Sequence, residues 1–162
     1  MRNDVGIWID HKKAVVVSLS GGPFKVDTID SNAEGRHRWS ARYHGANAGS
    51  PQESAREKTL EEKRRQHLLR YYRALIGKIR KSCHIYILGP GEAKLELEKE
   101  IRKSKELAPR IAAVETADKM PETQIVLKVK EFYRKLEERV SAPSGSKARR
   151  TVFAPVGATH SV

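Results

Sequence analysis

Three carboxylates come directly after apolar runs of the sequence, a place where polar residues often do chemistry. Asp10 ends the run that starts at Val5, and Glu115 and Asp118 follow the run 111–114. Carboxylates that meet at the carboxyl ends of parallel strands can hold Mg²⁺ for hydrolysis. The structural alternative, which we favour, is that Asp10 lies in a hairpin turn and Asp118 caps the following helix. No catalytic residue is therefore assigned among these three candidates.

A glycine-rich turn offers a second kind of site, for an anion. Gly89-Pro90-Gly91 separates an apolar run from a predicted helix, and a helix N-terminus can receive a phosphate. Gly89, Gly91 and Lys94 are the candidate contacts, because a lysine near a helix start runs against the helix dipole. The segment lacks the Gly-Lys-Ser/Thr ending of a P-loop. A tight strand-to-helix turn explains the glycines equally well.

The remaining patterns exclude several classes of protein. The histidines show no metal-ligand spacing, and Cys83 is the only cysteine, so we predict no metal and no cofactor. We expect Cys83, which precedes the apolar run 85–88, to be a small buried side chain. No apolar run approaches the length of a membrane span, and residues 1–4 lack a signal-peptide pattern. The chain is therefore expected to be cytoplasmic and to bind no membrane.

The elements that must position these residues follow from apolar patterning. The predicted order is β-β-β-α-β-α-β-α, an α/β fold with a mixed, RNase H-like sheet of about five strands and helices packed on it. The predicted strands cover residues 5–9, 14–19, 24–29, 84–88 and 111–114, and the predicted helices cover 55–81, 92–106 and 121–140. Residues 1–140 should form one domain with a long mobile loop at 31–54, and residues 141–162 a disordered basic tail.

The net charge of +12 is unevenly spread. Residues 56–81 hold ten basic and three acidic side chains, which gives +7, whereas residues 1–30 hold four of each and sum to zero. Clustered Lys and Arg are typical of proteins that bind polyanions, because neutralising phosphates releases counterions. A generic solubilising surface is the alternative.

Two segments supply the candidate RNA-binding residues. In the loop, aromatic and guanidinium planes on which unstacked bases can stack lie close together; Trp39 alternatively anchors the loop to the domain. In the helix, cations are predicted to face away from the apolar stripe that contains Tyr72. The candidates are Arg36, Arg38, Trp39, Arg42 and Tyr43 in the loop, and Lys63, Arg64, Arg65, Arg70 and Arg73 in the helix.

Four segments in order resemble a family of small bacterial translational-machinery proteins, homologous to the middle domain of the archaeo-eukaryotic peptide-chain release factor. The segments are Val5-Gly6-Ile7-Trp8-Ile9-Asp10-His11-Lys12-Lys13-Ala14, Leu88-Gly89-Pro90-Gly91-Glu92-Ala93-Lys94-Leu95-Glu96-Leu97, Val114-Glu115-Thr116-Ala117-Asp118 and Pro121-Glu122-Thr123-Gln124-Ile125. The resemblance spans about residues 5–136 and implies an RNase H-like fold. In the release factor, a Gly-Gly-Gln loop before the long helix promotes peptidyl-tRNA hydrolysis. The corresponding residues 44–52 contain no Gly-Gly-Gln, so release activity is not expected.

We interpret the chain as a translation-associated protein that binds the ribosome, tRNA or rRNA and is not an enzyme. One alternative is a hydrolase on an RNase H-like scaffold, either a peptidyl-tRNA hydrolase or a metal-dependent nuclease. The other is a protein-interaction module whose basic helix meets an acidic partner.

Overall fold

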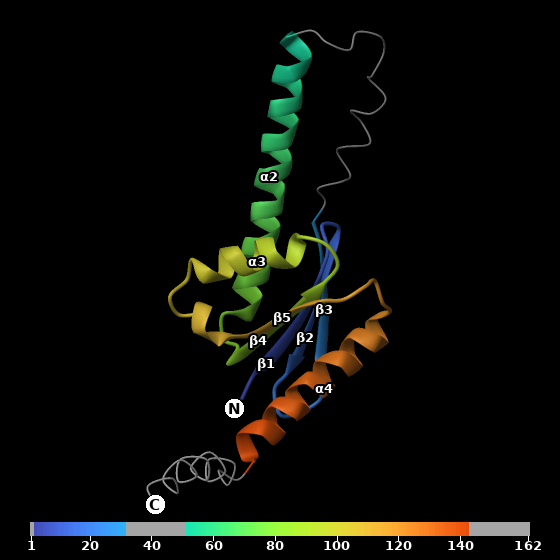
Figure 1. Ribbon diagram of the computed structural model, residues 1–162, viewed down its shortest axis with the longest axis vertical. Coiled ribbons are helices and arrows are strands. Elements are labelled where there is room, and N and C mark those ends of the chain that lie inside the picture. Colours follow the sequence, from blue (N-terminus) through green and yellow to red (C-terminus); the bar gives the residue numbers. More distant parts are fainter. Residues whose placement is uncertain (1, 32–50, 143–162) are drawn as a thin grey trace, which may run out of the picture. The chain divides into compact units, whose positions relative to one another are not determined.

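The strands of the chain form one mixed sheet in a computed structural model that describes residues 2–31 and 51–142, with only the backbone described at residues 51–53. The strands are β1 (Asp4–Ile9), β2 (Lys13–Leu19), β3 (Lys25–Asp30), β4 (His84–Gly89) and β5 (Ile111–Thr116). Their order in the sheet is β3-β2-β1-β4-β5 (Figure 1). The sheet is antiparallel from β3 to β1 and parallel from β1 to β5. The predicted fold class is therefore confirmed.

The central strand β1 explains why the sheet is stable. Ile7 lies opposite Val16 of β2 on one side and Ile87 of β4 on the other. All six residues of β1 are buried, as expected for a strand covered on both faces.

Helices cover the two faces of the sheet. The helices are α2 (Pro51–Ile79), α3 (Ala93–Arg102), the short 3₁₀ helix η2 (Ala108–Arg110) and α4 (Glu122–Ser141). The second half of α2 and the inner side of α3 pack on one face, where Leu75 and Leu97 join the core. On the other face α4 begins, and Val129 packs so closely on Gly6 that a side chain at position 6 would overlap it. The core thus needs a glycine in β1.

The chain divides into two compact units, residues 1–130 and residues 131–162. In the second unit the helical residues are linked by ion pairs one turn apart, Arg134 to Glu138 at 2.6 Å and Lys135 to Glu131 at 3.1 Å. The predicted division into a domain at 1–140 and a tail at 141–162 stays a prediction, since residues 143–162 lie outside the described part of the chain.

Several predicted details were wrong. The helix α2 starts at Pro51 rather than near residue 55, inside the segment predicted as a loop; proline suits a first helical position because it has no N–H to leave unpaired. The helix α3 ends at Arg102 rather than near residue 106, and the turn that follows buries Leu107. Cys83 is exposed, and the preceding Ser82 is buried in its place.

Candidate nucleic-acid interface

The carboxyl ends of β1, β4 and β5 converge at one edge of the sheet, as the sequence predicted. A side chain at Gly89 would overlap the carbonyl of Ile9, so only glycine allows these strand ends to lie this close. The backbone N–H of Ala117 donates to the carbonyl of Gly89 at 3.0 Å. The polar residues that follow each strand are therefore neighbours.

Asp10 holds the turn between β1 and β2. Its Oδ1 accepts hydrogen bonds from the backbone N–H groups of Lys12 at 2.8 Å and Lys13 at 2.7 Å. Glu115 instead accepts a hydrogen bond from the hydroxyl of Tyr86, whose pKa is raised by burial and by this contact. In the part of the chain that the structure describes, no three His, Cys, Asp or Glu side chains are grouped to hold a metal ion.

Asp118 does not cap α4. The carbonyl that accepts the first backbone hydrogen bonds of α4 belongs to Pro121, from Gln124 at 3.0 Å and Ile125 at 3.1 Å. The Asp118 carbonyl accepts a hydrogen bond from the Trp8 indole N–H at 3.3 Å. Its backbone therefore fixes the segment that leaves β5.

The glycine-rich turn between β4 and α3 is closed by its own lysine. Gly91 has a φ of +63°, which favours glycine. Lys94 is buried, and its ammonium donates a hydrogen bond to the Gly91 carbonyl. Anion binding at Gly89, Gly91 and Lys94 stays a prediction. It would require the Lys94 ammonium to bind an anion while it also donates to the Gly91 carbonyl.

The two halves of α2 have different surroundings. Residues 54–66 are all exposed, whereas Tyr71, Tyr72, Leu75 and Ile79 are buried. Within the described ranges, no ion pair involves residues 55–66. The predicted RNA-binding cations of α2 are all exposed; they are Lys63, Arg64, Arg65, Arg70 and Arg73.

These cations do not share one face, which corrects the sequence prediction. Arg65 lies seven residues before Tyr72, so it is on the same side of the helix as the core. Arg64 and Arg65 line a cavity together with Tyr72, whereas Lys63 and Arg70, also seven apart, lie on another side. Arg64 and Arg65 stay exposed because the helix extends beyond the edge of the sheet.

The cavity, of about 520 Å³, lies between α2, α3 and the turn after β1, and we call it the α2–α3 cavity. It is lined by His11, Glu61, Arg64, Arg65, Leu68, Leu69, Tyr72, Glu92, Glu96, Lys99 and Glu100. At its base Glu96 Oε2 accepts a hydrogen bond from the Tyr72 hydroxyl and lies 3.3 Å from His11 Nε2. Burial and the contact with Glu96 raise the pKa of Tyr72, so its hydroxyl remains a donor. The neighbouring Tyr71 donates to the Asp10 carbonyl at 3.2 Å.

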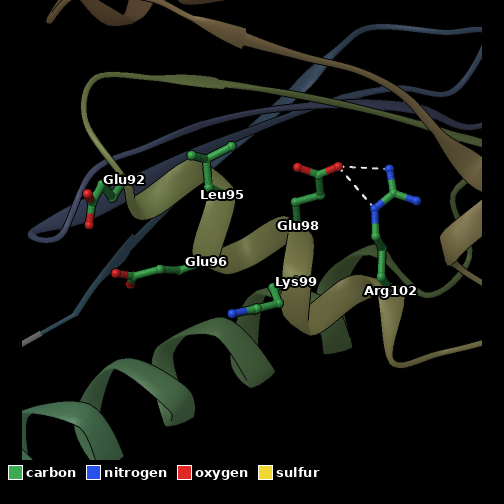
Figure 2. A pocket seen from close by; sticks show the side chains of 6 residues that line it. All are labelled: Glu92, Leu95, Glu96, Glu98, Lys99 and Arg102. Atoms are coloured by element: carbon green, nitrogen blue, oxygen red, sulfur yellow. Dashed lines mark hydrogen bonds and ion pairs between the residues drawn. The ribbon is translucent and has the colours of Figure 1, made fainter.

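A smaller pocket of about 400 Å³ lies along α3 (Figure 2). Five of the six side chains that line it come from this helix, and the sixth, Glu92, is the N-cap residue just before it. In Figure 2 Glu96 and Lys99 point to the side where α2 lies, and Glu98 pairs with Arg102 at 2.8 Å on the other side. Glu92, Glu96 and Lys99 also line the α2–α3 cavity, so we treat this pocket as continuous with it and not as a second site.

Sequence reasoning missed the central residues of the cavity. The prediction that Tyr72 belongs to the core is confirmed, but sequence reasoning gave neither His11 nor Glu96 a ligand-binding role. One signal was present: Glu96 follows the glycine-rich turn by about one helical turn, at the edge where ligands gather. The loop candidates Arg36, Arg38, Trp39, Arg42 and Tyr43 lie outside the described residues. None of the described helices is long and apolar enough to cross a membrane.

Comparison with known proteins finds similarity in structure. No protein-family model matches the sequence, and no curated protein matches it. The chain is similar to Pelota from Archaeoglobus fulgidus, with a TM-score of 0.49 and 11% identity over 98% of this chain and 41% of that one. It is also similar to the archaeal translation termination factor aRF1, with a TM-score of 0.39 and 14% identity over 86% of this chain and 42% of that one. The chain thus spans about two fifths of the length of these proteins.

Proposed function

We propose that this chain is a translation-associated protein that binds RNA or the ribosome and has no catalytic role. The observation that supports RNA binding most is the exposed, cationic first half of α2. Residues 55–66 are exposed and, within the described ranges, take part in no ion pair, so their cations are available to phosphates. The assignment to translation depends on the four-segment resemblance, and the archaeal protein named above is by its name a termination factor.

The hydrolase alternative lacks support in the described part of the chain. The Asp10 carboxylate accepts hydrogen bonds from the backbone of its own turn, and the Glu115 carboxylate accepts one from the Tyr86 hydroxyl. Among the described residues, no three His, Cys, Asp or Glu side chains are grouped to hold a metal ion. We therefore propose that Asp10, Glu115 and Asp118 are structural. An acidic protein partner remains the alternative to RNA on the cationic helix.

The test replaces Arg64, Arg65 and Arg70 with Gln and measures binding to ribosomes and to RNA across a salt series. Each lost phosphate contact lowers the slope of log K against log salt by roughly one unit, so the slope should fall by about two to three units. Stability should change little, because exposed charges contribute little to folding.

A matched control removes the same number of positive charges from another surface. In this variant, Gln replaces Arg134, Lys135 and Arg139 of α4. This control should bind nearly as the original protein does. If the α2 variant binds RNA and ribosomes unchanged at every salt concentration, the RNA proposal is wrong. An acidic protein then becomes the expected partner of α2.

A further inference from the structure

The α2–α3 cavity does not suit a phosphate. Its lining holds four glutamates against two arginines and one lysine, so an anion inside it would meet more negative than positive charge. The arginines, however, come from the exposed half of α2, which the proposed function assigns to the RNA backbone. A strand held there would have its phosphates outside the cavity and its bases within reach of it.

The interior offers a hydrogen-bond acceptor that is already oriented. Glu96 Oε2 is engaged by Tyr72 and His11. Glu96 Oε1 makes no hydrogen bond within the described ranges and belongs to a side chain about 40% exposed. A carboxylate held in this way favours a ligand that donates, and glutamate is a known acceptor for the exocyclic amino group of cytosine.

The walls fit a flat group. Leu68 and Leu69 supply aliphatic surface on which the face of a base can pack. The volume of about 520 Å³ lies within the range of cavities that hold small ligands.

We propose that the α2–α3 cavity takes a single unstacked nucleobase that carries an exocyclic amino group, with Glu96 as its acceptor. This inference depends on the proposed function, since the RNA backbone must first lie on α2. It predicts discrimination against uracil, which presents an oxygen where cytosine presents the amino group.

The test compares a short oligouridine with the same oligonucleotide carrying one central cytidine or adenosine. The original protein should bind the substituted oligonucleotides roughly tenfold more tightly, measured by fluorescence anisotropy at fixed salt. In Glu96→Gln, Tyr72 and His11 hold the amide oxygen, so the amide N–H₂ faces the cavity. The preference should vanish or turn toward uridine.

Two further variants keep the test decisive. Glu98→Gln changes the same residue type on the other side of α3, and it should keep the preference. Leu69→Trp fills the cavity, and it should lose the preference while keeping salt-dependent binding to oligouridine; this variant decides the question if Glu96→Gln fails to fold.

The outcomes separate the two proposals. If no oligonucleotide binds, the proposed function fails. If all bind equally to the original protein, RNA binding stands and the base site is wrong. Glu96-dependent binding of a tetralysine peptide, without any discrimination among the oligonucleotides, would overturn the proposal in favour of a protein ligand.

Discussion

The two halves of α2 differ although they form one continuous helix. Residues 67–79 are held by the sheet and by α3, whereas residues 54–66 are all exposed, and only a few of them reach the margin of the α2–α3 cavity. The packed half gains stability from buried apolar area, whereas the exposed half buries little and depends mainly on its helix propensity. The difference shows that one helix can anchor a domain at one end and present charge to a partner at the other.

The largest effect should come from truncating a core leucine in the packed half. Leu75→Ala leaves a cavity in a fully buried position and should lower the free energy of unfolding by about 2–5 kcal/mol. Leu60→Ala in the exposed half, at a side chain 36% exposed, should change it by no more than about 0.5 kcal/mol. Urea unfolding measures both. If Leu60→Ala and Leu75→Ala lowered the free energy of unfolding by similar amounts, residues 54–66 would have to be packed, and the contrast between the two halves of α2 would be wrong.

A second effect, a loss of folding stability at alkaline pH, should come from the packed half of α2 and not from the exposed half. Burial, first of all, raises the pKa values of Tyr71 and Tyr72 above the ordinary value of 10.0. The unfolded chain loses these protons near pH 10 and the folded chain keeps them. The stabilisation is therefore complete below pH 10 and falls as pH rises above it, by up to about 1.4 kcal/mol per pH unit for each tyrosine.

Urea midpoints between pH 8 and pH 11 test this, with the variant Tyr71→Phe, Tyr72→Phe as the control. The variant should show a flatter decline, since only its other groups still titrate. An equally steep decline in both proteins would mean that the two hydroxyls are not protected.

The smallest effect concerns helix propensity. Gly77 lies in the packed half with open space around it, so Gly77→Ala should raise stability by about 0.4–1 kcal/mol. Ala55→Gly in the exposed half weakens the helix locally by a similar amount. Because we expect that half to unfold separately from the domain, the global melting temperature should stay the same. Calorimetry distinguishes the two. A drop in melting temperature for Ala55→Gly would mean that the two halves unfold together.

The same comparison explains how far the sequence could be interpreted. Periodicity located the strands and the packed half of α2, because burial imposes an apolar pattern. The start at Pro51 was missed because the residues that follow it, 54–66, face solvent, where no such pattern is imposed. The face of Arg64 and Arg65 was misjudged because cations were assumed to avoid the core side, although a separation of seven places Arg65 with Tyr72. The hydrogen bonds of Glu96 depend on how three separate segments meet, which spacing along the chain does not predict.

The central place of β1 has a consequence for synthesis. Its two neighbours are far apart in the chain, since Val5 lies opposite Ser18 on one side and Ile85 on the other. A nascent chain that has formed the β1–β3 meander keeps one edge of β1 unpaired until β4 leaves the ribosome. At ordinary elongation rates that interval is roughly 3 to 11 seconds. An open apolar edge of that duration is a site for aggregation. Slowing elongation while β1–β3 has left the ribosome and β4 has not should therefore lower the yield of folded protein more than the same slowing after β4 has emerged.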